Sequence, residues 1–389
     1  MFRLLTAGES HGCGLVAIIE GLPRGLAVDT GRINRELARR QRGYGRGKRM
    51  QIERDRVEIL SGVRFGQTLG SPVALWIENL DFENWRQAMD PLMPPASDSA
   101  RRRVSHPRPG HADLAGALKY GTKDVRDILE RASARETAVR VAAGGLVRPL
   151  LAEFGIEISS HVIRVGEVAV PEPLAVPWEQ VVSLPEDSPL RCVDPEVERA
   201  MMAEVDRVKA TGDTVGGVFQ VVAHGVPVGL GSHVHWDRRL DGRLAQALMS
   251  VPAVKAVEIG AGVGAGSAVG SAFHDEIFHQ DKKGFFRKTN RAGGIEGGIS
   301  NGQDLRLNGY MKPLSTLIRP LSSVDLDTKA PRRAAVERTD TTAIAAAGVI
   351  GEAVSALVLC EMLLEKFGGD SIEETRRNYE GFLAQLRAF

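Results

Sequence analysis

The sequence predicts a single α+β unit spanning residues 1–389, on the strength of three observations. Hydrophobic residues make up 43% of the chain and charged residues 25%, a globular composition with enough apolar material for a large core. Segments with strand-like and helix-like patterns occur throughout the chain. The length alone would allow about two or three domains, but no internal repeat and no linker rich in Pro, Gly or Ser divides the sequence.

The first half of the chain mixes short strands with two helices. Runs of β-branched and other apolar residues predict strands at 2–6, 15–19, 57–60 and 72–77. Helices are predicted at about 30–42, which is charged, and at 133–154. In the second helix Ser133 can act as the N-cap, Glu136 stands at capping-box spacing, and Gly155 can end the helix.

The second half continues the same mixture. Helices are predicted at 195–209, 240–249 and 341–367, and strands at 215–223 and 253–259. The last helix carries four apolar residues on one face, at spacings of i, i+4, i+7 and i+8, and is therefore expected in the core. These four residues are Ile350, Val354, Leu357 and Val358.

Two long segments, 90–110 and 281–302, lack a hydrophobic period and are predicted to be loops. The first is rich in Pro, Ser and Arg, and glycine is dense shortly before the second. Loops of this length in compact proteins are usually functional or disordered. Both carry many charges, which suits the mouth of a binding site.

Charge, cysteine content and hydropathy exclude several classes of protein. The 50 Lys and Arg residues against 49 Asp and Glu residues give a net charge of +1, which excludes a polyelectrolyte surface. The three cysteines form no C-x-x-C pair and no complete disulfide framework, which favours a reducing compartment. The N-terminal segment lacks the apolar core of a signal peptide, and Glu352 interrupts the most apolar helical stretch. A cytoplasmic protein without a transmembrane span is expected.

Residues 8–12, Gly-Glu-Ser-His-Gly, match the G-x-S-x-G nucleophile elbow and would suggest a serine hydrolase that uses Ser10. An elbow turns from a strand into a helix, whereas the residues at 14–19 are β-branched and favour a second strand. The segment is therefore either a plain hairpin turn or a tight turn that presents Ser10 and His11 to a pocket.

The segment from Arg39 to Arg49 contains six cations, three glycines and no acid. A solvated helix end and an RNA-binding surface are the simpler interpretations. Each glycine would cost a helix roughly 1 kcal/mol, so the spacing better suits a loop that closes on an anion. Neither a Walker ATPase nor a Rossmann site for a nucleotide such as NADP is predicted, because both glycine motifs fail in detail.

Three further segments place polar side chains beside a predicted helix start. His111 precedes Asp113, which could cap a helix, so this histidine is either a partner of the cap or a catalytic group. The segment 131–136 offers a hydroxyl and two guanidinium groups, which suit an anion or an ordinary cap. Asp340 is either the cap of the last helix or a general base. A small polyanion is the natural ligand for such segments, and no metal is expected because no histidine cluster has a third ligand at zinc spacing.

Together these segments resemble the chorismate synthase family over nearly the whole chain. The segments that carry the resemblance are 8–12, 43–47 with 49–50, 108–113, 131–136, 292–298 and 312–313. The resemblance implies a β-α-β sandwich in a homotetramer and the elimination of phosphate from 5-enolpyruvylshikimate 3-phosphate to give chorismate. It also implies non-covalent reduced FMN as a cofactor and a role in aromatic amino acid biosynthesis, at the last common step of the shikimate pathway.

The resemblance also assigns roles to individual residues. It places His11 at the leaving phosphate, His111 at the flavin, and Asp340 at the proton chemistry of flavin N5. The implied substrate contacts are Ser10, Arg40, Arg46, Arg49, Arg108, Ser133, Arg135 and Arg338. The implied flavin contacts are Arg131, Ala132, Ser133, Pro252, Ala253, Gly297, Lys312, Pro313, Leu314, Ser315, Thr316 and Arg338.

Three positions, Lys48, Arg291 and Ser315, depart from the commoner family pattern, but none removes an expected catalytic group. Because no Rossmann signature is found, the flavin is expected to be reduced by a separate reductase or reductant. Two alternatives stay open: a serine hydrolase that uses Ser10, and an RNA-binding protein that uses residues 39–49. The second is weakened by the low aromatic content of 5%, since single-stranded RNA is usually bound by stacking.

Overall fold

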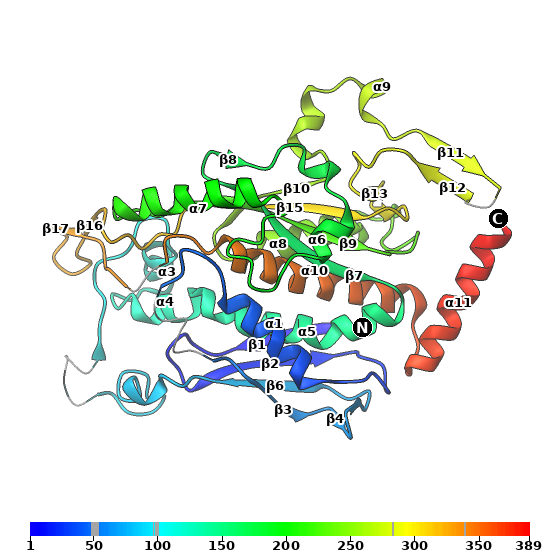
Figure 1. Ribbon diagram of the computed structural model, residues 1–389. Helices are drawn as coiled ribbons and strands as arrows, with labels where there is room; N and C mark the ends of the chain where they lie inside the picture. The colour runs from blue at the N-terminus through cyan, green and yellow to red at the C-terminus, as the bar shows by residue number, and fades with distance from the viewer. Residues whose placement is uncertain (48–53, 96, 98–100, 282–283, 338–339) are drawn as a thin grey trace.

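The computed structural model describes residues 1–47, 54–95, 97, 101–281, 284–337 and 340–389. Two antiparallel sheets lie on either side of a layer of helices (Figure 1). This arrangement confirms the predicted α+β class.

The first sheet has four strands in the order β1-β2-β6-β3, and each neighbouring pair is antiparallel. The strands are β1 (Arg3–Ala7), β2 (Gly14–Glu20), β3 (Val57–Ser61) and β6 (Val73–Glu78). In β2, Leu15, Ala17 and Ile19 are buried, whereas Ile18 is exposed. Because side chains alternate between the faces of a strand, one face of this sheet is left for the helices to cover.

The second sheet has five antiparallel strands in the order β10-β15-β9-β7-β8. They are β7 (Glu157–Val165), β8 (Val168–Ala169), β9 (Gly217–His224), β10 (Val254–Ile259) and β15 (Leu305–Met311). The side chains of β7 and β9 are buried on both faces over most of their length. Their buried positions include polar residues, Ser159, Ser160 and His161 in β7 and Gln220 in β9.

Helices α1 (Thr30–Gln41), α5 (Thr137–Glu153) and α10 (Ile344–Phe367) fill the space between the sheets. Helix α5 packs on β2 and β6, and α10 packs on β7 and β9. The two helices approach closely at Gly144, where an added Cβ would lie 2.6 Å from the Cβ of Ala353. A larger residue at Gly144 would therefore push α5 and α10 apart.

Helix α10 is buried on all sides rather than on one face, which corrects the one-sided pattern predicted for it. It is long and apolar enough to cross a membrane by length and composition, but 89% of its most apolar window is buried inside the structure. It also begins three residues later than predicted, at Ile344 instead of residue 341. The predicted boundary failed because the residues before Ile344 form a loop that belongs to the site described below.

The remaining elements surround this core. The other α-helices are α3 (Asp113–Tyr120), α4 (Arg126–Ala132), α6 (Trp178–Val182), α7 (Pro195–Ala210), α8 (Leu240–Met249), α9 (Gly270–Phe273) and α11 (Ile372–Ala388). The short 3₁₀ helices are η2 (Phe82–Asn84), η3 (Ala134–Glu136), η4 (Pro173–Ala175), η5 (Trp236–Arg238) and η6 (Gly262–Ser267). Helix α8 packs against α10 and β10 and completes the helix layer.

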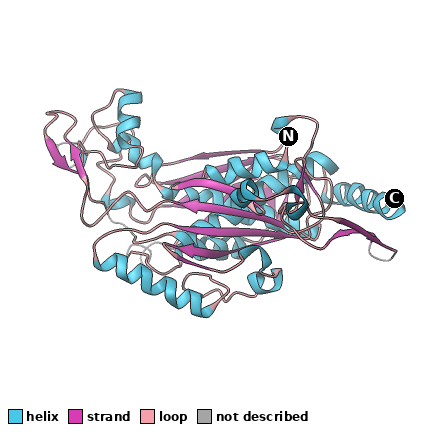
Figure 2. Cartoon of the chain, turned by 90° about the horizontal axis from the view of Figure 1, so that it is seen from above, coloured by secondary structure: helices cyan, strands magenta, loops and turns pink. Residues whose placement is uncertain are grey.

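Four two-stranded hairpins complete the fold. They are β4 (Val63–Arg64) with β5 (Gln67–Thr68), β11 (Ile277–Gln280) with β12 (Gly284–Arg287), β13 (Ile295–Glu296) with β14 (Ile299–Ser300), and β16 (Ser322–Val324) with β17 (Pro331–Arg333). The β11–β12 hairpin and α11 project from one end of the body, and β16–β17 lies at the other (Figure 2). The prediction of an unstructured loop over 281–302 is therefore wrong, because three of these short strands lie within it.

Candidate functional site

The turn between β1 and β2 carries Ser10 and His11 into the interior, where they are 3% and 7% exposed. The backbone N–H of Ser10 donates to the Glu130 carbonyl at 3.0 Å, and the Asn79 amide donates to the Gly12 carbonyl at 2.9 Å. The residues after the turn form β2, as the β-branched pattern predicted. The segment is thus a hairpin turn and not a strand-to-helix elbow, so the serine hydrolase alternative loses its structural basis.

The His11 ring is fixed by a carboxylate and an aromatic side chain. Its Nδ1 lies 2.8 Å from Glu130 Oε1, its backbone N–H donates to Oε2 at 2.8 Å, and its ring stacks on Trp85 with centroids 3.7 Å apart. Burial raises the pKa of Glu130, but the hydrogen bonds and charge of His11 outweigh this effect and hold that pKa below its usual value. An ionised carboxylate only accepts, so the Nδ1 of His11 carries a proton and the orientation of the ring is fixed.

Cations surround this pair as well. Arg126 donates to Glu130 Oε1 at 3.1 Å and lies 5.0 Å from the centre of the Trp85 ring, while Arg102 lies 4.0 Å from the same ring. Trp85, Arg126 and Glu130 were missed by sequence reasoning. The available signals were that Glu130 directly precedes the segment 131–136 and that Trp85 is one of only four tryptophans.

His111 forms a second histidine–carboxylate pair, just before α3. Its Nδ1 donates to the buried carboxylate of Asp113, which also accepts from Arg108 Nε at 2.8 Å and from Arg108 Nη2 at 3.1 Å. Burial raises the pKa of Asp113, but the bonds from His111 and Arg108 hold it well below its usual value. The predicted role of Asp113 as a helix cap is wrong, because the N-cap of α3 is Ala112 and no side chain caps it.

Arg40 and Arg135 share one buried carboxylate. Arg40 donates to the Thr137 hydroxyl at 3.0 Å and to the Ala134 carbonyl at 2.9 Å, and both guanidinium groups pair with Asp55. Asp55 was not predicted. Because Arg40 is only 5% exposed, it cannot belong to a solvated basic face, and the RNA-binding alternative loses part of its proposed surface.

Ser133 caps a short helix at this position. Its hydroxyl accepts from the Arg135 backbone N–H at 3.3 Å, so it caps η3, and α5 begins only at Thr137. The predicted single helix from residue 133 is therefore divided in two. Just before it, Arg131 donates to the carbonyls of Thr6 and Gly8 at 3.0 and 3.1 Å. Residues 130–135 thus place the His11 pair beside the Arg40–Arg135 pair.

Arg46 and Asp340 meet near the start of α10. Arg46 Nη1 lies 3.0 Å from Asp340 Oδ2, and the Gly47 backbone N–H donates to Asp340 Oδ1 at 2.6 Å. The N-cap of α10 is Ala343, so Asp340 does not cap this helix. The other two arginines of this predicted group, Arg49 and Arg338, lie outside the described residues.

The predicted flavin segment 312–316 lies against the His111 loop. Lys312 Nζ donates to the Gly110 carbonyl at 2.7 Å and contacts the Ser315 hydroxyl at 3.0 Å, while Arg108 Nη1 donates to Thr316 Oγ1 at 3.2 Å. Burial lowers the pKa of Lys312, with a smaller effect from Lys255. This arrangement links the flavin segment directly to the second histidine pair.

Other predicted flavin contacts are placed less uniformly. Ala253, next to Pro252 and in the left-handed backbone region at φ 70°, accepts from the Lys312 backbone N–H at 2.9 Å. The carbonyl of Leu314, next to Pro313, accepts a hydrogen bond from the Thr214 hydroxyl at 2.8 Å. The next residue, Val215, donates its backbone N–H to the carbonyl of Thr341, which follows Asp340. Ala132 ends α4 beside Arg131 and Ser133. Gly297 lies apart in the β13–β14 hairpin, which no hydrogen bond between described residues connects to the 312–316 segment.

Comparisons with known proteins identify the family of this chain. A family model described as chorismate synthase matches residues 2–364. Chorismate synthase of Desulforudis audaxviator is 58% identical over 390 residues, covering 100% of this chain and 99% of the relative. The enzyme of Carboxydothermus hydrogenoformans is 55% identical over 386 residues, covering 99% of each chain.

A crystal structure of chorismate synthase superposes with a TM-score of 0.80 at 43% identity, covering 100% of this chain and 99% of that one. The fold, the length and the sequence thus agree over the whole chain, including all segments that place the two histidine–carboxylate pairs. The chain belongs to the chorismate synthase family.

Proposed function

We propose that this carbon–oxygen lyase, which eliminates phosphate from 5-enolpyruvylshikimate 3-phosphate to give chorismate, uses His11, His111 and Asp340 as its catalytic residues. One observation carries the proposal: two histidines, the buried His11 and the half-buried His111, each pair with a buried carboxylate among buried arginines. Histidine rings in fixed orientations can hold or transfer protons, and arginines bind carboxylates and phosphates.

The arginines are proposed to bind the substrate, which carries two carboxylates and a phosphate and therefore about four negative charges. Arg40, Arg46, Arg108 and Arg135 each already bond to a carboxylate of the protein. A guanidinium group has five donors, so such a pair can orient it while other donors meet the substrate. Arg49 and Arg338, with the hydroxyls of Ser10 and Ser133, are proposed to complete this set.

His11 is proposed to protonate the leaving phosphate. Glu130 fixes the ring in place, and the neighbouring Arg126 supplies positive charge where negative charge develops. Asp113 fixes the ring of His111 in the same way beside the flavin segment. Asp340 is proposed to hold or accept the proton at N5 of the flavin, as the family resemblance implies, and its bond to Arg46 would hold it in place.

The family requires a reduced flavin, and we propose that this chain binds reduced FMN without a covalent bond. Its residues fit such a group: the amine of Lys312 and the hydroxyls of Ser315 and Thr316 can hold a phosphate, and a Cβ added at Gly297 would meet open space. When bound, reduced FMN supplies an electron that is later recovered, so the elimination involves no net oxidation. Arg131, Ala132, Pro252, Ala253, Pro313, Leu314 and Arg338 are the further proposed contacts.

An anaerobic assay tests this proposal. We expect one portion of chemically reduced FMN to support many turnovers, measured as phosphate released per flavin, because the cofactor is regenerated in each cycle. Oxidised FMN should support none. A ratio at or below one, or equal rates with oxidised flavin, would contradict the mechanism.

A second test concerns the directional contacts of Arg46. We expect Arg46→Lys to raise KM by about tenfold or more although the charge is kept. Lysine cannot reproduce the bidentate contact that a guanidinium group makes with a carboxylate or phosphate of the substrate. Arg42→Lys is the matched control, since Arg42 lies in the same segment but is half exposed, and its one ion pair with a described residue is the pair with Glu186. If both variants have the same KM and turnover, Arg46 does not bind the substrate and its role is structural.

Three further points are also proposals: the oligomeric state, the source of the electrons that reduce the flavin, and the place of the protein in the cell. The resemblance supports a soluble homotetramer in the cytoplasm, with flavin reduced by a separate reductase or reductant. The buried position of α10 is in keeping with a soluble protein. Cross-linking in solution would report four copies per particle.

A further inference from the structure

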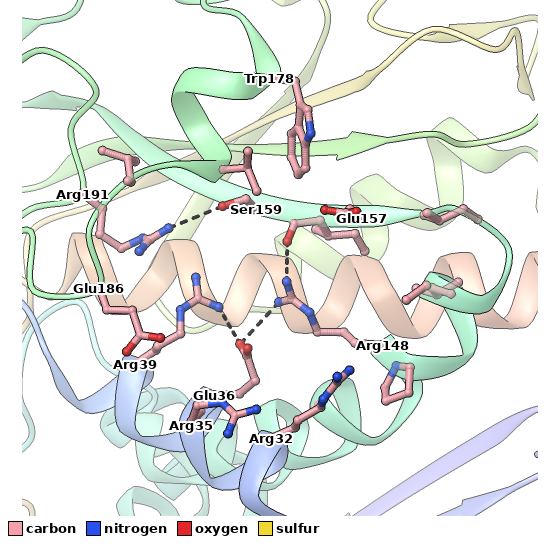
Figure 3. A pocket seen from close by; sticks show the side chains of 18 residues that line it. Arg32, Arg35, Glu36, Arg39, Arg148, Glu157, Ser159, Trp178, Glu186 and Arg191 are labelled. Atoms are coloured by element: carbon pink, nitrogen blue, oxygen red, sulfur yellow. Dashed lines mark hydrogen bonds and ion pairs between the residues drawn. The ribbon is translucent and has the colours of Figure 1, made fainter. Parts of the chain in front are cut away.

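A pocket with a volume of about 390 Å³ lies between α1, α5, β7 and the segment 178–191 (Figure 3). Among the residues that the structure describes, its lining shares none with the catalytic, substrate or flavin residues proposed above. Its volume is within the range of small-molecule sites. The pocket is therefore a separate feature whose chemistry can be examined independently of the elimination.

Five arginines line this pocket: Arg32, Arg35, Arg39, Arg148 and Arg191. Two of them are neutralised by glutamates. Arg39 bonds to both oxygens of the fully buried Glu352 at 2.8 Å and to Glu36 at 2.6 Å, and Arg148 bonds to Glu352 at 2.8 Å. Figure 3 shows Arg39 and Arg148 converging on Glu36.

Arg191 is neutralised only in part. Its side chain is 10% exposed, and its Nη2 donates to the Ser160 carbonyl at 3.0 Å and lies 3.9 Å from Glu352. Its Nε has no hydrogen-bond partner among the described residues. Its backbone has φ 57°, in the left-handed region that costs energy for a residue other than glycine. A buried guanidinium with an unused donor is expensive unless an acceptor is bound.

The rim of the pocket carries further positive charge. Arg35 is exposed and makes no hydrogen bond or ion pair with the described part of the chain. Two neighbouring residues must be counted as well, because Arg42 pairs with the lining Glu186 and Asp29 pairs with the lining Arg32. With these and Glu352 included, six arginines face five acidic residues and leave one positive charge. This balance suits a ligand with a single negative charge rather than a polyanion.

Apolar side chains form the rest of the lining. They are Pro149, Leu151, Ala152, Ile156, Trp178, Val182 and Leu184. Val182 is 46% exposed, and Trp178 is held in place by stacking on His224 with centroids 5.2 Å apart. The lining thus combines cationic and hydrophobic side chains, as a site for an amphipathic anion requires.

We propose that this pocket binds a small organic monocarboxylate with an apolar body. The carboxylate meets Arg191, with Arg35 at the entrance, because a guanidinium binds a carboxylate with directional, charge-assisted bonds. The apolar body lies against the apolar side chains that include Trp178 and Val182. The proposal depends on none of the catalytic roles assigned above.

The test uses 3-phenylpropionate as the probe and isothermal titration of the full-length protein. Saturating 5-enolpyruvylshikimate 3-phosphate with oxidised FMN is present throughout, so that the probe cannot occupy the substrate site. We expect saturable binding of one probe per chain and no saturable binding of the neutral 3-phenylpropanamide. Absence of saturable binding, or equal binding of the amide, would overturn the proposal.

Two variants locate the binding. Arg35→Gln and Arg191→Gln are each expected to weaken the Kd by at least about tenfold, as the loss of a charge-assisted contact does. Arg199→Gln is the matched control, because Arg199 is exposed on α7 and does not line the pocket. Arg35 is exposed, so its variant keeps the test decisive even if Arg191→Gln fails to fold. An unchanged Kd in the folded variants would place the probe elsewhere and refute the site.

Discussion

Replacing Glu352 by glutamine is expected to lower the free energy of unfolding by about 3–5 kcal/mol, the usual cost of removing one partner from a buried ion pair. Glu352 is fully buried on α10, and it accepts hydrogen bonds from Arg39, Arg148 and the Ser160 hydroxyl. Burial raises the pKa of Glu352, but the charges of Arg39 and Arg148 outweigh it and keep the carboxylate ionised. A glutamine would leave Glu36 as the remaining carboxylate partner of both guanidinium groups and would turn a donor toward them.

Glu365→Gln is the matched control for this change. Glu365 lies on the same helix and pairs with Arg238, but both side chains are about half exposed. Exposed pairs contribute only about 0–1 kcal/mol, so this variant should unfold at nearly the urea concentration of the unmodified protein. If the two variants lose equal stability in urea titrations, burial is not what makes the Glu352 cluster important.

A loss of about 10²- to 10⁴-fold in turnover is expected for His11→Ala, the range typical of removing an acid–base group. The ring is held between Glu130 and Trp85, so its removal takes away the proposed proton donor to the phosphate. His111→Ala should cause a loss in the same range, because Asp113 holds that ring in a similar way. Both losses should be measured as a lower rate of phosphate release under anaerobic conditions with reduced FMN.

Two further variants distinguish catalysis from structural support. His11→Asn can keep a hydrogen bond to Glu130, so a purely structural histidine should tolerate it, whereas a proton donor should not. His233→Ala is the matched control, because His233 lies exposed in a loop away from both histidine pairs. Near-normal turnover in a folded His11→Asn would exclude the proposed role.

Elements with a strong local pattern were predictable from the sequence. Helix α8 was predicted at its observed bounds, and the strands β2 and β10 were found within one residue at each end. The hairpins within residues 281–302 were missed, because their two- to four-residue strands are too short to show a period. Pairing with neighbouring segments, rather than local sequence, determines them.

The candidate site shows the same limit. The sequence pointed to Ser10, His11 and His111, which stand in short motifs of unusual composition. It did not point to Glu130 or Asp55, because these carboxylates are recognisable only by their partners, His11 and Arg135, which are 119 and 80 residues away. Nothing in one sequence indicates which of 49 acidic residues will meet a given histidine or arginine.

The position of α10 between the sheets has a consequence for synthesis on the ribosome. Arg39 and Arg148 are made first, and their carboxylate partner Glu352 follows 313 and 204 residues later. The central helix of the core is therefore among the last segments to emerge. Until it does, the helix-facing sides of both sheets have no complete cover, and contacts of such long range are slow to form. A nascent chain that stops before α10 should accordingly depend on chaperones rather than fold as a stable fragment.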